Sequence, residues 1–507
     1  MLLNNEFYKK LKLGKFVKEK EDELFLALFI LTLIVSIYFF TKTYSQALWF
    51  DEADYLNFGK YLAFGYPEWG LSPVRPPLFP LVSALFFKIG FGEIGLRIIM
   101  ILSGLSNTVL IYLIGKELDN KRVGLIAAAI MALFWSHLFF TFRLLVDVPV
   151  LTLWLLSTYF FVKGYINEGK KKYIWMIAPA LFIGFLIKYL NAFLIIIILV
   201  YLLMTERLKF LKDKDLWMSA GIGIIMSIPF FIFQKLYYGS FFAFLKASLV
   251  GRTTLGRTFT DFFVEYIKNL FPMVGGKYLW VGTLFSIIFI IGFIKILEIF
   301  LGLDLIFKNK DKKLTKELFL FLWLIGSLAF LAKLGYGHYI EERYAFGFFA
   351  AVFLIIAIGI NKIYDSVKNY NKLAATALVI LILVLGAYSN LAHAKLLIEN
   401  KAESFIQVKQ AGEFLQENLR KNEGYLSPAT SAEIQYHSNR KNMGSNLQAA
   451  LTDEKIKYVV ISIFNQMPAG YLEFIQSNPD KFKPVETYFL DKENKQPAVI
   501  IFKIIRN

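Results

Sequence analysis

Long apolar runs constrain the fold of this chain more than any other feature. A helix needs ~20 apolar residues to cross ~30 Å of hydrocarbon, and lipid offers no partner for backbone groups left outside a helix or a closed barrel. The chain is therefore predicted to be a polytopic α-helical membrane protein with about eleven transmembrane helices. The expected spans are residues 23–41, 92–115, 123–141, 148–166, 174–188, 192–204, 217–236, 279–301, 318–334, 345–363 and 373–391.

Basic residues between the runs predict the orientation. They concentrate on alternate segments, among them residues 9–20, 170–172 and 308–316, and Lys and Arg mark cytoplasmic loops. The N-terminus is thus expected in the cytoplasm. An odd number of spans then puts the C-terminal part outside the cell, in a multi-pass protein of the cell membrane. Residues 78–90 are apolar but too short to span, and we expect a partly embedded helix there.

Composition excludes several classes. The chain is 57% hydrophobic and 19% charged, with 52 Phe and no Cys, so disulfides and thiolate metal sites are absent. The net charge of +17 is explained by topology and by contact with anionic membrane lipid, and we expect no nucleic-acid partner. GIGIIM at 221 and GYGHYI at 335 lack the third glycine of a dinucleotide fingerprint, and no Walker motif occurs.

The tail differs from the rest of the chain. Residues 392–507 lose the long apolar runs, KAESFIQVKQAGEFLQENLRK has helical spacing, and IKYVVISIF and PAVIIFKII are typical of buried strands. We expect two domains, a transmembrane domain of residues 1–391 and a small extracytoplasmic α/β domain of residues 392–507.

Polar side chains gather on the segments that this topology places outside. An ionisable group at the centre of a membrane helix costs ~3 kcal/mol, so these groups are not expected to face lipid tails. We expect one polar cavity open to the outside. Its candidates are Asp51, Glu52, Tyr55 and Arg75 in the first segment, Arg143 and Asp147 in the second, Lys188 and Tyr189 in the third, and His338, Glu342, Arg343 and Tyr344 in the fifth.

Carboxylates beside cations suit sugar transfer from a polyprenyl phosphate. The phosphate is already a good leaving group and needs cations to hold its charge. The acceptor hydroxyl needs a base, and an Asp or Glu can take its proton as the new bond forms. The minimal set of groups is one carboxylate and an Arg/Lys cluster, and the expected outcome is a single displacement with inversion at the sugar carbon.

The motifs resemble a known family. WFDEADY followed by RPPLFP is similar to the first outer loop of the GT-C membrane glycosyltransferases, within the protein O-mannosyltransferase and lipid A aminoarabinose-transferase branch. FRLLVDVPVLTLW, LFIGFLIKYLNAFL and HYIEERYAFGFFAAVFLIIA resemble further segments of that branch, and the tail resembles its soluble domain. One departure is the run AFGFFAAVF, which lacks the prolines that often follow the Arg-Tyr pair.

The resemblance implies roles for these residues. Asp51 would be the catalytic base with Glu52 beside it, and either carboxylate remains open for that role. Asp147 would help to bind the acceptor or a divalent cation, Mg²⁺ or Mn²⁺, and no other cofactor is implied. The implied donor is a hexose or mannose-like sugar on a polyprenyl or dolichyl phosphate, and the acceptor is a protein, lipid or glycan. The phosphate contacts would be Arg75, Arg143, Lys188 and Arg343.

Structural readings of the same residues stay open. Asp147 also suits a helix N-terminus, and Lys188 also suits snorkelling to the interface. Tyr55 suits an interfacial aromatic belt, His338 a structural histidine, and Glu342 an ion pair with its neighbour Arg343. The alternative function is a secondary transporter or flippase of a lipid-linked sugar. Against it, the chain shows no repeated halves, and its charges lie in loops.

Overall fold

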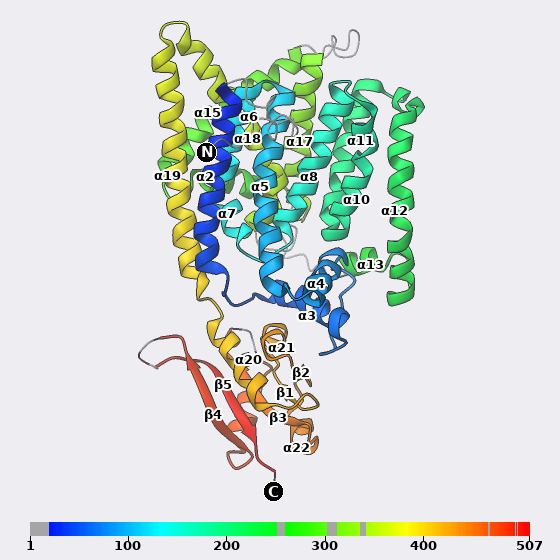
Figure 1. The fold of residues 1–507 in the computed structure, drawn as a ribbon, viewed down its shortest axis with the longest axis vertical. Coiled ribbons are helices and arrows are strands. Elements are labelled where there is room, and N and C mark those ends of the chain that lie inside the picture. The colour runs from blue at the N-terminus through cyan, green and yellow to red at the C-terminus, as the bar shows by residue number, and fades with distance from the viewer. Residues whose placement is uncertain are drawn as a thin grey trace, which may run out of the picture. The chain divides into compact units, whose positions relative to one another are not determined.

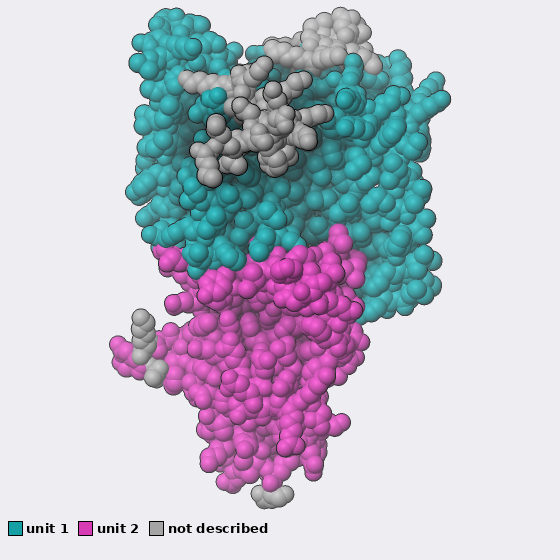
Figure 2. Space-filling view, viewed as in Figure 1, with its two compact units in different colours: residues 1–41, 98–398 teal, residues 42–97, 399–507 magenta. Residues whose placement is uncertain are grey.

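The chain folds into two compact units. The structure, a computed structural model, describes residues 20–250, 259–301, 312–334, 341–464, 467–491, 493 and 495–506. The first unit comprises residues 1–41 and 98–398, and the second comprises residues 42–97 and 399–507 (Figure 2). These units do not follow one cut in the sequence. The division into domains 1–391 and 392–507 stays a prediction.

The regular elements described for the first unit are helices (Figure 1). Apolar side chains make up most of each long helix, so their packing against other helices and lipid, rather than a single amphipathic face, defines them. They are α2 (Lys20–Thr43), α5 (Gly92–Leu118), α6 (Lys121–Leu133), α7 (Trp135–Thr141), α8 (Asp147–Phe161), η2 (Val162–Ile166), α9 (Lys171–Trp175), α10 (Ile177–Ile187), η3 (Tyr189–Ala192), α11 (Phe193–Glu206), η4 (Lys209–Lys212), α12 (Lys214–Tyr238), α13 (Ala243–Val250), α14 (Phe259–Gly275), α15 (Leu279–Leu301), α17 (Lys312–Leu334), η5 (Glu342–Ala345), α18 (Phe346–Lys368) and α19 (Lys372–Ala402).

The prediction of a polytopic helical membrane protein is confirmed. Within the described residues, nine helices are long and apolar enough to cross a membrane, and the count is ten if α6 and α7, which meet at a bend of 58°, form one span. The count of eleven is not confirmed. The expected span at residues 174–188 divides into the 5-residue α9 and the 11-residue α10, which are each too short to cross ~30 Å of hydrocarbon. The apolar stretch at residues 78–90 forms the short helix α4 (Leu78–Lys88).

Glycines allow a close helix crossing in the first unit, between α15 and α18. A Cβ on Gly292 would lie 2.0 Å from the carbonyl oxygen of Ile355, and one on Gly359 would lie 2.2 Å from that of Ile288. Small residues at such crossings let helix backbones approach, which is how helices pack in lipid without a hydrophobic driving force.

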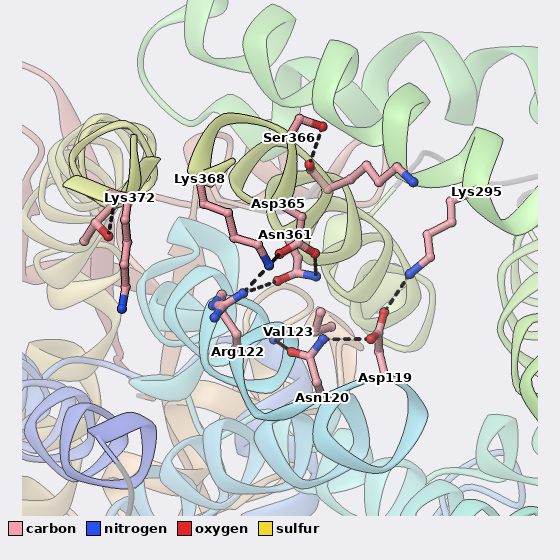
Figure 3. A network of polar contacts seen from close by, with 12 residues as sticks. Asp119, Asn120, Arg122, Val123, Lys295, Asn361, Asp365, Ser366, Lys368 and Lys372 are labelled. Atoms are coloured by element: carbon pink, nitrogen blue, oxygen red, sulfur yellow. Dashed lines mark hydrogen bonds and ion pairs between the residues drawn. The ribbon is translucent and has the colours of Figure 1, made fainter. Parts of the chain in front are cut away.

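A polar network ties α18 to α6 (Figure 3). Arg122 donates to the Asn361 side chain at 3.0 Å and lies 3.6 Å from the carboxylate of Asp365. Lys368 donates to that carboxylate at 2.6 Å. Nearby, Asp119 accepts from Lys295 of α15 at 2.9 Å. These contacts link α6 to α18, and the turn between α5 and α6 to α15, through side chains that are mostly half-buried.

The second unit combines helices with a mixed sheet, which confirms the predicted α/β tail. Parallel pairing joins β1 to β2 and to β3, antiparallel pairing joins β5 to β3 and to β4, and the order is β2-β1-β3-β5-β4. The expected strands appear as β3 and β5. The elements are α3 (Phe50–Phe64), α4, α20 (Ile406–Asn418), β1 (Gly424–Leu426), α21 (Ser431–Ser438), β2 (Lys441–Asn442), α22 (Leu447–Thr452), β3 (Ile456–Ser462), α23 (Tyr471–Gln476), β4 (Phe482–Phe489) and β5 (Pro497–Ile504).

Helices cover both faces of this sheet. On β3, Tyr458 and Val460 pack in one apolar cluster with residues of α20 and α21. Val459 and Ile461 pack in another with residues of α22 and α23. A strand buried on both faces is expected to be continuously apolar and β-branched, which explains why this segment was recognisable in the sequence.

Helix α21 is fixed to α3 by polar contacts. Asn57 donates to the carbonyl of Ala432 at 2.7 Å. Lys60 donates to the carbonyl of Tyr436 at 2.8 Å and to the side chain of Asn439 at 2.7 Å. The side chains at the middle of α3 therefore hold both ends of α21, within a single compact unit.

Candidate active site

The acidic stretch after the first span forms the first turn of α3. Carboxylates are stabilised there by the positive end of the helix dipole. Glu52 is fully buried, and its Oε2 accepts from the backbone N–H of Trp49 at 2.6 Å, which caps the helix. The side chain of Asp51, in contrast, is 32% exposed. Of the two predicted bases, Asp51 is the one that solvent reaches.

Arg75 joins two carboxylates of α3. Its Nη2 lies 2.6 Å from Oδ1 of Asp51, and its Nε lies 2.8 Å from Oδ2 of Asp54. The guanidinium lies 4.8 Å from the centre of the Tyr55 ring. The indole N–H of Trp69 donates to the other oxygen of Asp54 at 2.9 Å. Arg75 and Tyr55 were predicted at the site; Asp54 and Trp69 were not among the predicted site residues.

Burial and neighbouring charges shift the pKa values of Asp54 and Arg75 in opposite directions. Burial raises the pKa of Asp54 above its usual value, and Arg75 and the Trp69 hydrogen bond only partly offset this. Burial alone would lower the pKa of Arg75, but Asp51, Tyr55 and Asp54 together raise it. Arg75 is therefore a permanent cation at the acidic end of α3.

A further carboxyl comes from the tail. Glu433, in the first turn of α21, is 1% exposed. Burial raises its pKa from 4.5 to about 7, and the negative charges of Asp51, Asp54 and Glu52 add to the shift. Glu433 was not among the predicted site residues, because SAEIQYHS is an ordinary polar helical segment that lies ~380 positions after α3 in the sequence.

In the first unit, a second charged group forms around Asp147. Its carboxylate lies in the first turn of α8, 2.5 Å from Nζ of Lys188 and 3.8 Å from Nη1 of Arg343. Lys188 lies between α10 and η3, with its Nζ 4.1 Å from the centre of the Tyr344 ring. Arg343 also pairs with Glu341. The structure thus brings together four of the predicted residues.

A small cavity adjoins these charges. Its volume is about 50 Å³, and Asp147, Lys188, Arg343 and Tyr344 are among its lining residues. Three more polar residues line it, and each has a buried atom without a hydrogen-bond partner among the described residues: Nε1 of Trp154, Oδ1 of Asn191 and Oγ of Ser327. Buried polar atoms without partners are costly, so a polar guest or ordered water suits this space.

The other predicted residues lie apart from this cavity's lining. Arg143 is 1% exposed in the turn before α8. Tyr189 packs its ring against Phe185 at 4.9 Å and Phe244 at 5.0 Å. Glu342 begins η5. His338 lies outside the described residues. The gathering of all candidates into one cavity stays a prediction.

The surroundings of Asp147 do not fit a divalent cation. Two cationic side chains already face its carboxylate, and within the described part of the chain no group of three His, Asp or Glu side chains is placed to hold a metal. Mg²⁺ and Mn²⁺ prefer several oxygen ligands. The metal at Asp147 stays a prediction.

Comparison with known proteins supports the resemblance read from the motifs. Residues 74–233 match the family model described as dolichyl-phosphate-mannose-protein mannosyltransferase. This segment includes Arg75, Asp147 and Lys188. No curated protein matches the chain at a significant level.

Solved structures with this fold match nearly the whole chain. ArnT from Cupriavidus metallidurans, bound to undecaprenyl phosphate, is similar with a TM-score of 0.67 at 11% identity, over 93% of this chain and 97% of that one. The oligosaccharyltransferase of Archaeoglobus fulgidus is similar with a TM-score of 0.55 at 13% identity, over 95% of this chain and 74% of that one. The chain has the GT-C fold and resembles the branch of protein O-mannosyltransferases and lipid A aminoarabinose transferases, as its motifs predicted.

Proposed function

We propose that the chain is an integral-membrane glycosyltransferase. It moves a hexose, of the mannose type, from a polyprenyl or dolichyl phosphate to a protein, lipid or glycan acceptor on the outer face. The family model that matches residues 74–233 is named for a dolichyl-phosphate-mannose donor, and the similar ArnT structure contains undecaprenyl phosphate. Both observations support a lipid-phosphate donor for this chain.

The observation that carries the proposal is the contrast between Asp51 and its acidic neighbours. Glu52 is buried and caps α3, and Asp54 is held by both Arg75 and Trp69. Asp51 keeps one third of its side chain exposed while Arg75 fixes its position. A general base must be oriented and must also reach the substrate, and of these three carboxylates Asp51 best combines the two.

The reaction also requires cations that hold the charge of the leaving phosphate. A leaving phosphate is stabilised by fixed Arg and Lys side chains, which need no reorganisation when the bond breaks. Lys188 and Arg343 line the cavity in the first unit beside the unpartnered atoms of Asn191 and Ser327. We assign Lys188 and Arg343 to the donor phosphate, with Asp147 keeping both cations in position.

The reaction is a single displacement. The acceptor oxygen attacks the anomeric carbon, and Asp51 takes the proton from that oxygen. The bond between the anomeric carbon and the phosphate oxygen breaks, and its electron pair leaves with the polyprenyl phosphate. The configuration at the anomeric carbon inverts, because attack and departure occur on opposite faces.

The outer face is supported by charge alone. Basic residues concentrate on alternate segments, and the positive-inside rule then places the first loop and the tail outside, in a multi-pass protein of the cell membrane with a cytoplasmic N-terminus.

Replacing Asp51 by asparagine tests the proposal. Loss of a general base lowers the rate by about 100- to 10,000-fold. Purified protein in vesicles would receive dolichyl phosphate carrying tritiated mannose, with glucose in a parallel reaction, and an extract of surface proteins, lipids and glycans as acceptor. Asp480→Asn, at an exposed position of the same unit, is the matched control and should remain active. Undiminished transfer by Asp51→Asn would refute the assignment.

The same vesicles separate transfer from transport. A glycosyltransferase moves the label from the lipid to the acceptor and releases polyprenyl phosphate. A flippase moves intact labelled lipid across the bilayer without breaking the bond. Movement of the label with no transfer would favour the flippase.

A further inference from the structure

Glu433 is held in place by contacts on both sides of it. Ala432, directly before it, accepts a hydrogen bond from Asn57 of α3. Gln435, two residues after it, donates to the carbonyl of Glu68 at 3.1 Å. The segment of α21 that carries Glu433 cannot move away from these partners without breaking the bonds. Glu433 is thus carried on a segment of the tail that is fixed to the helix bearing Asp51.

The surroundings of Glu433 are unusual for an acid. It is buried, and its Oε2 has no hydrogen-bond partner among the described residues. Arg75, the cation paired with the acidic end of α3, directs its bonds to Asp51 and Asp54. A buried carboxylate with one oxygen left unpartnered is costly, so burial favours the neutral acid, and a backbone hydrogen bond to the carboxyl offsets this only in part.

Charged and titratable groups approach α21 from the elements packed against it. The carboxylates of α3 and the phenol of Tyr425 in β1 face Glu433. The cations near this helix act on His437, whose pKa is lowered to about 3 by burial and by these charges. The groups facing Glu433 are Asp51, Glu52, Asp54 and Tyr425, and those acting on His437 are Lys409, Lys60 and Arg97.

We propose that Glu433 is a positioning residue for the transfer reaction, which governs how strongly Asp51 binds the proton it takes from the acceptor. The proposal rests on the proposed function. It makes the soluble tail part of the chemistry, because the residue that adjusts the base is carried on α21.

The effect is electrostatic and needs no new bond. Protonated Glu433 adds no charge beside Asp51. Ionised Glu433 adds one negative charge, which raises the proton affinity of Asp51 and makes it a stronger base. The proton of the acceptor still goes to Asp51, while Glu433 exchanges its own proton with solvent. With a pKa of about 7 for Glu433, the change falls in the neutral range, and the transfer rate should rise with pH there.

The first measurement is the pH dependence of kcat/KM with tritiated dolichyl phosphate mannose. Glu433→Gln keeps the shape of the side chain but cannot ionise. We expect the wild-type rate to rise about three- to tenfold around pH 7, and Glu433→Gln to lack this rise and stay near the low-pH value. Glu473→Gln, at an exposed position of α23, should keep the wild-type profile. A merely structural role would change the rate without removing the rise.

The second measurement follows the proton on Glu433 without using activity. A hydrophobic carbodiimide reacts with protonated carboxyls, and mass spectrometry of the intact chain's peptides locates the label. Labelling of Glu433 should fall with a midpoint near pH 7. A midpoint near 4.5, or a rise in rate that persists in Glu433→Gln, overturns the positioning role even if Asp51→Asn is inactive. Transfer by Asp51→Asn instead overturns the proposed function, and this role with it.

Discussion

Replacing Glu433 by glutamine is expected to stabilise the second unit above pH 7 and to change its stability little in acid. The pKa of Glu433 rises from 4.5 to about 7 on folding, because the native unit buries its carboxyl beside other carboxylates. The folded state then binds the proton more tightly than the unfolded state. The resulting stability is fully present below about pH 4.5 and is lost as the pH rises through about 7.

The size of the effect follows from the shift. One pKa unit corresponds to 1.36 kcal/mol, so a shift of about 2.5 units removes about 3 kcal/mol from the wild type above pH 7. Glutamine cannot ionise, so the variant does not lose this stability as the pH rises. The difference in the free energy of unfolding, variant minus wild type, should therefore grow by about 2 to 3 kcal/mol between pH 5 and pH 8.

Hydrogen exchange of the full-length protein in detergent measures this difference within the second unit. Peptides that cover β3, the central strand of the sheet, report opening of the second unit. Variant and wild type are compared at the same pH, so that intrinsic exchange rates cancel, and Glu473→Gln serves as the exposed control. A difference that is equal at pH 5 and pH 8 would show that Glu433 does not hold a proton in the folded state.

Two further predictions concern the first unit, and thermal unfolding in detergent measures both. Gly359→Ala should destabilise it by about 1–3 kcal/mol, because the new Cβ would lie 2.2 Å from the carbonyl of Ile288. Gly221→Ala, where a Cβ meets nothing within 4 Å, should be neutral or stabilising by up to about 1 kcal/mol; equal losses at both sites would contradict this packing. Lys188→Met should lower the free energy of unfolding by about 3–5 kcal/mol, because it removes the ammonium that lies 2.5 Å from the buried carboxylate of Asp147. Adding Asp147→Asn should restore most of this loss. A double variant as unstable as the single one would show that the pair is not coupled.

The long elements were predictable because their signal is local. Apolar runs gave the spans, and the β-branched runs gave β3 and β5. The prediction was less successful at residues 174–188, where the chain forms two short helices. α10 ends at Ile187, and Lys188 is extended, which lets its ammonium reach Asp147. Hydropathy cannot register such a break, since the residues on both sides of it are equally apolar.

Part of the candidate site was predictable, because it too has a local signal in the sequence. Asp51 and Glu52 stand out in the sequence because acids are rare beside an apolar run. Their difference in exposure is not visible there, because it depends on Glu52 folding back to cap α3. The pairing of Arg75 with both Asp51 and Asp54 depends on the loop between them returning to α3.

Lys60 shows that the tail contributes to the surroundings of α3, the helix with the acidic first turn. In the sequence it is one more lysine in a loop between apolar runs. In the structure it is half-buried, and desolvation lowers its pKa to about 8, yet its ammonium donates to the carbonyl of Tyr436 and the side chain of Asn439. Three residues earlier along α3, Asn57 holds Ala432. A helix that uses its own polar side chains to hold α21 cannot shift relative to Glu433 without leaving these groups unpaired, at a cost of about 1–3 kcal/mol for each one. The tail therefore helps to fix the surroundings of Asp51, the residue proposed as the base.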